Sequence, residues 1–301
     1  MMAGLIPVFL LLLTGILARR WGLLDDSSAN GLNRLVANLA LPAMLIAKVG
    51  TSPLAESLSW RLMAVTCGLA TVVGGLALLL TRSWRLAPAQ RGVLAQAALR
   101  GNVAYVSFPI VLAAYGDGGL RLAAVTSAAL IPTMNLVSVL ILEMHRGEHQ
   151  SLARLTRRVL INPLVLATLI GLGGAALHWQ PWKWLADSLR ILGEFALPGA
   201  LLALGAQLKR RSARGLWRPT SVAVLLKMAV LPVLGLWVLR FVGASPLETA
   251  VGVLIMAAPT AVASYPVAAD LGGDTDLAGT CILVSTIVAF PAYFLWSLVL
   301  P

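Results

Sequence analysis

The chain has 301 residues, of which 59% are hydrophobic and only 12% are charged. Soluble domains carry roughly 25% charged residues, so a water-soluble fold of this length would lack a polar surface. The composition also excludes disordered, collagen-like and disulfide-rich secreted proteins. It predicts an all-α polytopic membrane protein.

Apolar runs recur along the whole chain. A helix needs about 20 apolar residues to cross a bilayer, whereas barrel strands are alternating segments of about 10 residues. The runs in this chain are long and continuous, which favours helices. We predict ten membrane spans: Met2–Ala18, Arg34–Gly50, Leu62–Leu80, Val93–Tyr115, Leu120–Glu143, Leu160–Leu177, Leu185–Gln207, Ser221–Val242, Leu247–Leu271 and Ala278–Leu300.

The net charge of +11 is distributed unevenly between the predicted loops. With the N-terminus outside, 15 Lys and Arg residues fall on the cytoplasmic side and 6 on the outer side. This bias follows the positive-inside rule and predicts that both termini are extracytoplasmic, in an inner (plasma) membrane. Topology and contact with anionic lipid therefore explain the basic excess, and no basic motif with interleaved aromatic residues indicates nucleic acid.

The second half of the chain repeats the first at an offset of 156 or 157 residues. Each repeat contains five spans, and this odd number predicts inverted repeats, which are typical of secondary transporters. We therefore divide the chain into a first repeat (1–144), a cytoplasmic linker (145–159) and a second repeat (160–301). The matching segments include Ala40-Leu41-Pro42 with Ala196-Leu197-Pro198, Ser107-Phe108-Pro109 with Ser264-Tyr265-Pro266, and Gly116-Asp117 with Gly273-Asp274.

The fourth and ninth spans carry prolines at equivalent positions, Pro109 and Pro266. A proline inside a helix costs about 3 kcal/mol, and irregular backbone in a bilayer has to be buried or line a cavity. Because helix N-termini favour anions, we predict two broken helices that cross near the midplane and bind a small anion, with simple kinks as the alternative. Arg100 would contact either this anion or a carboxylate. The candidate site residues at the breaks are Arg100, Asn102, Tyr105, Pro109, Thr260, Ser264, Tyr265 and Pro266.

Other polar residues lie within the predicted spans, where ionisable groups are functional candidates because burying a charge in a membrane is costly. Glu194, Asp270 and Asn38 are candidates for binding a coupling ion. Glu194 could instead be an interfacial acid, and Asp270 a residue of the cytoplasmic mouth. Asn135 is either a site residue or a source of interhelical hydrogen bonds, and Lys227 is interpreted as structural or interfacial.

The motifs at the two breaks resemble the auxin efflux carrier family. Residues 100–109 read Arg-Gly-Asn-Val-Ala-Tyr-Val-Ser-Phe-Pro, residues 263–270 read Ala-Ser-Tyr-Pro-Val-Ala-Ala-Asp, and Asn162-Pro163 opens the sixth span. The resemblance covers essentially the whole chain. It implies ten helices in two inverted repeats, a bile-acid-sodium-symporter-like fold with scaffold and transport modules, and elevator-type alternating access.

The resemblance also implies roles for individual residues. In the plant carriers an asparagine seven residues before the first crossover proline binds the substrate carboxylate, and Asn102 holds that position; Asn162 matches a second asparagine at the sixth span. Bacterial members of the family are linked to malate, malonate and related acids. The chain departs from the plant carriers at residues 59–65, which contain no acid to bind a proton. Proton coupling, sodium coupling and no coupling therefore remain open.

These observations predict a secondary carrier that moves a small organic anion, such as malate, malonate or an auxin-like acid, by elevator-type alternating access. We expect no enzymatic activity, no cofactor and no metal, and no nucleotide-binding loop occurs. The expected partners are the anion, membrane lipid and, from the resemblance, a second copy of the chain. The alternatives are a passive channel or a ligand-sensing protein; an intramembrane enzyme would need paired catalytic groups that the scattered acids do not supply.

Overall fold

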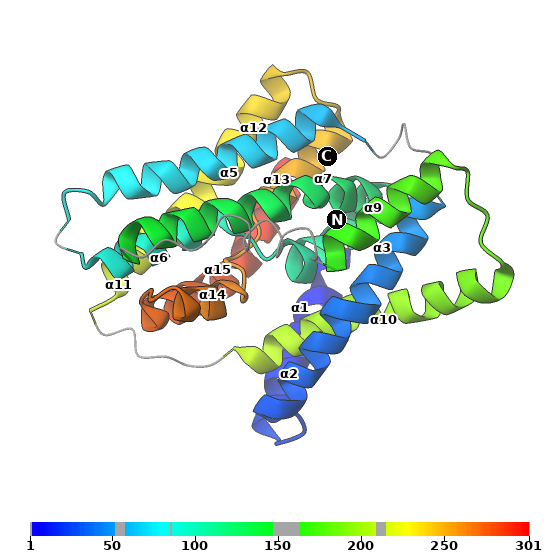
Figure 1. Ribbon diagram of the computed structural model, residues 1–301, viewed down its shortest axis with the longest axis horizontal. Helices are drawn as coiled ribbons and strands as arrows, with labels where there is room; N and C mark the ends of the chain where they lie inside the picture. Colours follow the sequence, from blue (N-terminus) through cyan, green and yellow to red (C-terminus); the bar gives the residue numbers. More distant parts are fainter. Residues whose placement is uncertain (1, 52–57, 85, 147–162, 209–214, 301) are drawn as a thin grey trace. The chain divides into compact units, whose positions relative to one another are not determined.

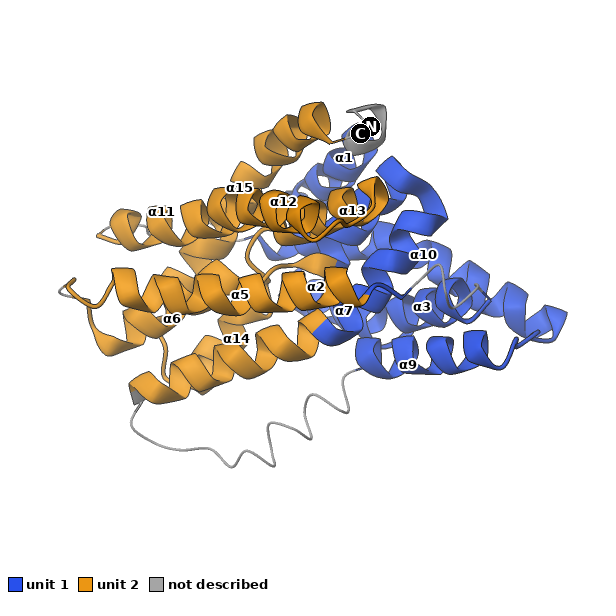
Figure 2. Ribbon diagram, turned by 90° about the horizontal axis from the view of Figure 1, so that it is seen from above, with its two compact units in different colours: residues 1–59, 104–129, 160–208 blue, residues 60–103, 130–159, 209–301 orange. Residues whose placement is uncertain are grey.

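The computed structural model describes residues 2–51, 58–84, 86–146, 163–208 and 215–300, and its regular elements are helices (Figure 1). The chain divides into two compact units (Figure 2). Unit 1 comprises residues 1–59, 104–129 and 160–208, and unit 2 comprises residues 60–103, 130–159 and 209–301. Each unit therefore combines segments from both halves of the sequence.

Unit 1 contains α1 (Met2–Arg20), α2 (Asp26–Leu35), α3 (Leu41–Gly50), α9 (Pro163–Ala176), α10 (Lys183–Gln207) and the first part of α7 (Phe108–Arg146). Helix α10 packs against α1, α2 and α3, and α3 also packs against α9. The close approach of α1 to α10 depends on glycine, because a Cβ on Gly205 would collide with the carbonyl oxygen of Leu12. Small residues of this kind let membrane helices pack backbone to backbone.

Unit 2 contains α5 (Trp60–Leu80), α6 (Pro88–Leu99), α11 (Trp217–Leu225), α12 (Leu231–Phe241), α13 (Pro246–Met256), α14 (Ser264–Asp270), α15 (Thr275–Val299) and the second part of α7. Helix α6 packs against α5, α11, α14 and α15, and α13 packs against α5 and α12. Seven residues of α6, from Val93 to Leu99, are buried in succession. This all-round burial makes α6 the centre of unit 2.

Helix α7 joins the segments that sequence analysis predicts as the end of the fourth span and the whole fifth span. The backbone at Gly116 has φ 62° and ψ −158°, which interrupts the helix at that residue. A left-handed φ is accessible to glycine without steric cost, so this position separates the two predicted spans as expected. The interruption at Gly116 lies within the predicted boundary between residues 115 and 120.

Among the described residues, six helical stretches are long and apolar enough to cross a membrane. Two shorter apolar helices, α9 and α13, accompany them in the described part of the chain. The prediction of an all-α polytopic membrane protein is therefore confirmed, while the count of ten spans stays a prediction. The six stretches are Asp26–Gly50, Trp60–Leu80, Val103–His145, Lys183–Gln207, Trp217–Phe241 and Thr275–Val299.

The described part of the chain contains three π-helical segments of five residues. In each case a single residue separates the end of the segment from a proline. A proline has no N–H for the carbonyl of the preceding turn, and its ring crowds that turn. The helix widens in response: the N–H of Leu231 donates to the carbonyl oxygen of Leu226, five residues back. Such widened turns are frequent at functional sites. The segments are η1 (Val36–Ala40), η2 (Val103–Ser107) and η3 (Leu226–Val230).

The fourth and ninth predicted spans are both interrupted, but each interruption lies before the proline. Residues 100–102 are non-helical and helical structure resumes at η2, so Pro109 lies inside a helix. Residues 257–263 separate α13 from α14, so Pro266 lies in the first turn of α14. The prediction that these prolines themselves break the helices is therefore wrong. A first helical turn tolerates proline, and the π-helical turn of η2 accommodates Pro109.

Candidate functional site

The two interrupted helices pair with each other through their non-helical segments, all within unit 2. Gly101 and Thr260 form an isolated antiparallel β-bridge. The N–H of Asn102 donates to the carbonyl oxygen of Pro259 over 2.7 Å, and the N–H of Ala261 donates to that of Arg100 over 3.0 Å. These bonds satisfy backbone groups that the interrupted helices leave free. We call the two paired segments, residues 100–102 and 257–263, the crossover.

Thr260 braces this crossover. Its backbone N–H donates to Ser285 Oγ over 3.0 Å, and its hydroxyl donates to the carbonyl oxygen of Ala97 over 3.1 Å. Its side chain is only 1% exposed. Thr260 thus uses its hydroxyl within the protein, and Ser285, which sequence analysis did not select as a site residue, holds it in place.

Three polar side chains at the crossover keep donors available. The Asn102 amide is 8% exposed and makes no hydrogen bond within the described part of the chain. Ser264 Oγ is buried and has no partner among the described residues. The Arg100 guanidinium is 9% exposed; its NH1 donates to the carbonyl oxygen of Ala263 over 3.3 Å, which leaves other N–H groups free. A buried group that can donate but has no acceptor is a candidate for ligand binding.

Gln96 adds a fourth polar side chain, one helical turn before Arg100. It is fully buried, and both its amide nitrogen and its amide oxygen lack a hydrogen-bond partner among the described residues. Sequence analysis missed this residue. The signal was present, because a glutamine inside the apolar run 93–99 has to satisfy two polar atoms away from water.

The remaining candidates of unit 2 occupy the periphery of the crossover. Tyr265 is half-buried, and Pro266 and Asp270 are exposed in α14. Asn135 is half-buried in α7, next to Met134, whose sulfur accepts the N–H of Gly101 over 3.4 Å. These four candidates therefore lie on elements that contribute to the crossover or follow directly from it.

Other candidates belong to unit 1. Tyr105 donates its hydroxyl to the carbonyl oxygen of Asn33 over 3.3 Å. The amide of Asn38 is exposed and donates to the carbonyl oxygen of Arg34 over 2.7 Å, within η1 and its preceding turn. Asn162 lies outside the described residues.

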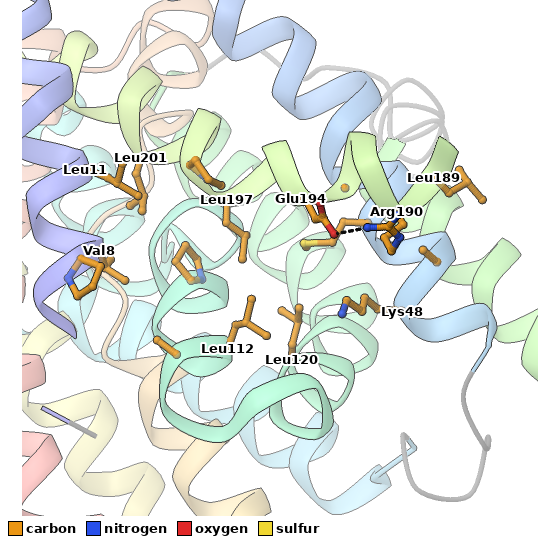
Figure 3. Close-up of a pocket in the computed structure, with 17 residues that line it drawn as sticks. Val8, Leu11, Lys48, Leu112, Leu120, Leu189, Arg190, Glu194, Leu197 and Leu201 are labelled. Carbon is orange, nitrogen blue, oxygen red and sulfur yellow. Dashed lines mark hydrogen bonds and ion pairs between the residues drawn. The ribbon is translucent and has the colours of Figure 1, made fainter. Parts of the chain in front are cut away.

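Pro109 and Glu194 line one pocket of about 520 Å³, formed entirely by unit 1 (Figure 3). Most of its wall is apolar, contributed by α1, α3, α7 and α10. Figure 3 shows Lys48, Arg190 and Glu194 together at one end, where Arg190 pairs with Glu194 over 2.9 Å. An apolar pocket with few polar groups at one end is a typical small-molecule cavity. Sequence analysis gave Pro109 and Glu194 separate roles; the structure brings them to one pocket.

Lys227 lies at the crossover and not at an interface. It belongs to η3, is 1% exposed, and donates from Nζ to the carbonyl oxygen of Met256 over 2.9 Å. Of the two interpretations of Lys227, structural or interfacial, the interfacial one is wrong, because the side chain is buried within unit 2. The signal that could have found it is its position near the middle of an apolar span, where an ionisable group is a functional candidate by default.

The charges of the crossover are therefore those of Arg100 and Lys227. None of the ion pairs found among the described residues includes either side chain. The described residues also contain no group of three or more His, Cys, Asp or Glu side chains suited to a metal ion. An all-helical membrane protein with paired interrupted helices and a buried cationic centre is the class of protein that these observations define.

Residues 1–297 match the family of membrane transport proteins, and the chain belongs to this family. This confirms the resemblance to the auxin efflux carriers, and it makes the chain a membrane transporter and not an enzyme. A protein of Methanothermobacter thermautotrophicus named as a transporter is 25% identical over 296 residues, which cover 98% of this chain and 97% of the relative. A protein of Rhizobium meliloti named provisionally as a malonate transporter is 26% identical over 299 residues, covering 94% and 91%. A Methanocaldococcus jannaschii protein named as a transporter is 24% identical over 302 residues, covering 97% and 96%.

Proposed function

We propose that the protein is a secondary carrier for small carboxylates and that the crossover of unit 2 binds the carboxylate group. The observation that carries this proposal is a set of side-chain donors at the crossover that have no acceptor among the described residues: the buried Ser264 hydroxyl, the Asn102 side-chain amide and the remaining N–H groups of Arg100. A carboxylate offers acceptor oxygens and a negative charge, which complement both the donors and the guanidinium.

Malonate is the first substrate to test, because one relative carries it in its name. Malate and an auxin-like acid are the next candidates. In this proposal Asn102 binds the carboxylate directly, with Tyr265 and Asn135 as further candidates of unit 2. Tyr105 and Asn162 stay candidates from the sequence alone. Pro109 and Pro266 shape the helices on either side.

The proposed mechanism is alternating access of the elevator type, with ten spans in two inverted repeats. Its support is that each compact unit draws on both halves of the sequence, as a scaffold and a transport module built from two repeats would. The energy would come from a proton or sodium gradient, or from the substrate gradient without a coupling ion. Glu194, Asp270 and Asn38 stay the candidates for the coupling ion, in an inner membrane with both termini outside.

Replacing Asn102 with alanine tests the carboxylate site. Losing one hydrogen bond to a charged group costs about 1.5–3 kcal/mol, so the Kd for malonate should rise roughly 10- to 150-fold. The measurement is the rise in melting temperature of the detergent-purified protein with malonate concentration, since a ligand of the folded state stabilises it by mass action.

Asn30→Ala is the matched control, because Asn30 is an exposed asparagine of α2. This variant should bind malonate like the wild type. Equal affinity of Asn102→Ala and the wild type would remove Asn102 from the site, and the absence of stabilisation by every carboxylate tested would reject the anion proposal. In liposomes a carrier shows saturation and counterflow, so uptake without either would identify a channel.

A further inference from the structure

Lys227 connects three parts of the crossover. Its backbone belongs to η3, and its Nζ donates to Met256, the last residue of α13. A Cβ added to Gly101 would lie 3.0 Å from the same Nζ, so the ammonium group lies against the backbone of the 100–102 segment. Gly101 in turn forms the bridge with Thr260. One side chain therefore contacts both interrupted helices.

The ammonium group lies where a helix presents negative charge. The last four carbonyl groups of an α-helix have no partner inside the helix, and together they carry about half a negative charge. The Met256 carbonyl is one of these groups, at the point where α13 stops. In a buried place, such a carbonyl favours a cation, and here Lys227 supplies one.

Carboxylates do not explain the burial of this charge. No ion pair found among the described residues includes Lys227. Lysine is long enough to extend its charged end to water when water is near, yet this side chain is 1% exposed. A buried charge is costly unless it is compensated, and the Met256 carbonyl is the compensating group that the structure provides.

We propose that the Lys227 ammonium is the resident cation of the crossover: it compensates the carbonyl that α13 leaves free at its end, and it fixes the 100–102 segment around the bound anion. Lys227 is a positioning residue in this account, since its charge is covered and does not touch the substrate. The part that concerns the anion rests on the proposed function, whereas the compensation of the Met256 carbonyl by the Lys227 ammonium does not.

Truncation of Lys227 to alanine, followed by addition of a small ammonium ion, tests whether a cation is needed at the Met256 carbonyl. Lys227→Ala leaves the Met256 carbonyl without its donor and vacates the volume of the side chain. Methylammonium, which has both the charge and the N–H donors of the lost group, should raise the melting temperature of Lys227→Ala saturably. Choline carries the charge without an N–H and serves as the control for ionic strength. The wild type and Lys183→Ala, which removes an exposed lysine at the start of α10, should respond equally to the two salts.

Lys227→Met separates charge from volume and is the second variant if Lys227→Ala does not fold. It keeps an unbranched side chain of similar length without the ammonium. We expect Lys227→Met to bind malonate at least about tenfold more weakly than the wild type, a loss of one hydrogen-bonded charge. Lys227→Arg should retain most of the affinity.

A Lys227→Met variant that matches the wild type in stability and malonate binding would overturn the inference. A Lys227→Ala variant that responds equally to methylammonium and choline would also overturn it. If the wild type binds no carboxylate, the proposed function fails, but the methylammonium measurement still decides whether a cation is needed at the Met256 carbonyl.

Discussion

At the scale of single residues, the crossover separates side chains that brace it from side chains that remain available. The N–H of Thr260 donates to Ser285 Oγ, and the Thr260 hydroxyl donates to the carbonyl oxygen of Ala97. The side chains of Asn102 and Ser264 have no hydrogen-bond partner among the described residues, although both lie at the crossover. Buried polar groups in a folded protein are nearly always hydrogen-bonded, so the second pair is the one that awaits an acceptor.

Ser285→Ala tests the bracing role. It removes the acceptor of the Thr260 N–H and leaves a buried donor unsatisfied, at a cost of about 1–3 kcal/mol. The melting temperature should therefore fall by several degrees, and malonate should bind more weakly because the crossover loosens. Ser297→Ala is the control on the same helix, since the Ser297 hydroxyl bonds to the Phe294 carbonyl of its own turn. Equal melting temperatures for the two variants would contradict the bracing role.

At the scale of elements, glycine sets how closely helices pack, and proline sets where they widen. Gly205 of α10 faces the backbone of α1, with no room for a Cβ beside Leu12. The π-helical segments show the other effect, because each one precedes a proline that cannot complete the hydrogen-bond ladder. One such segment, η3, carries Lys227 into the crossover.

Gly205→Ala tests the contact between α1 and α10. The added methyl group would meet backbone and not a flexible side chain, so the helices have to separate, which costs about 1–3 kcal/mol. Thermal unfolding in detergent should show a lower melting temperature. Gly173→Ala in α9 is the control, because a Cβ at Gly173 meets nothing within 4 Å. Alanine is the better helix former, by about 1 kcal/mol, so this control should be neutral or stabilising. A stabilised Gly205→Ala would contradict the close packing of α1 and α10.

At the scale of the whole molecule, the two units cut across the two sequence repeats. Residues 104–129 belong to unit 1, although they lie between segments of unit 2. The chain therefore passes between the units several times, and each unit is completed only when both halves of the sequence have been made.

Reporter fusions test the predicted topology. An alkaline phosphatase fused after residue 301 should be active, because the positive-inside rule places the C-terminus outside. A green fluorescent protein at the same position should be dark, and the reverse pattern is expected for insertions in the 145–159 linker. A fluorescent C-terminal fusion would invert the assigned orientation, and identical behaviour of the two sites would contradict an odd number of spans between them.

The sequence by itself determined the class of the protein and directed attention to the region of the candidate site. The hydrophobic composition dictates membrane helices, because nothing else satisfies the backbone in a bilayer. The repeated motifs directed attention to residues 100–109 and 259–266. These features are local, and periodicity and composition record them directly.

Tertiary structure decided how the polar residues are used. Asn102 and Thr260 are both polar residues next to a break. The Asn102 side chain has no hydrogen-bond partner among the described residues, whereas the Thr260 hydroxyl donates to the carbonyl oxygen of Ala97. Lys227 is about 125 residues from Gly101 in the chain, and only the packing of η3 brings its ammonium to that segment. A hydrogen bond depends on the position of both partners, and the sequence specifies those positions only through the whole fold.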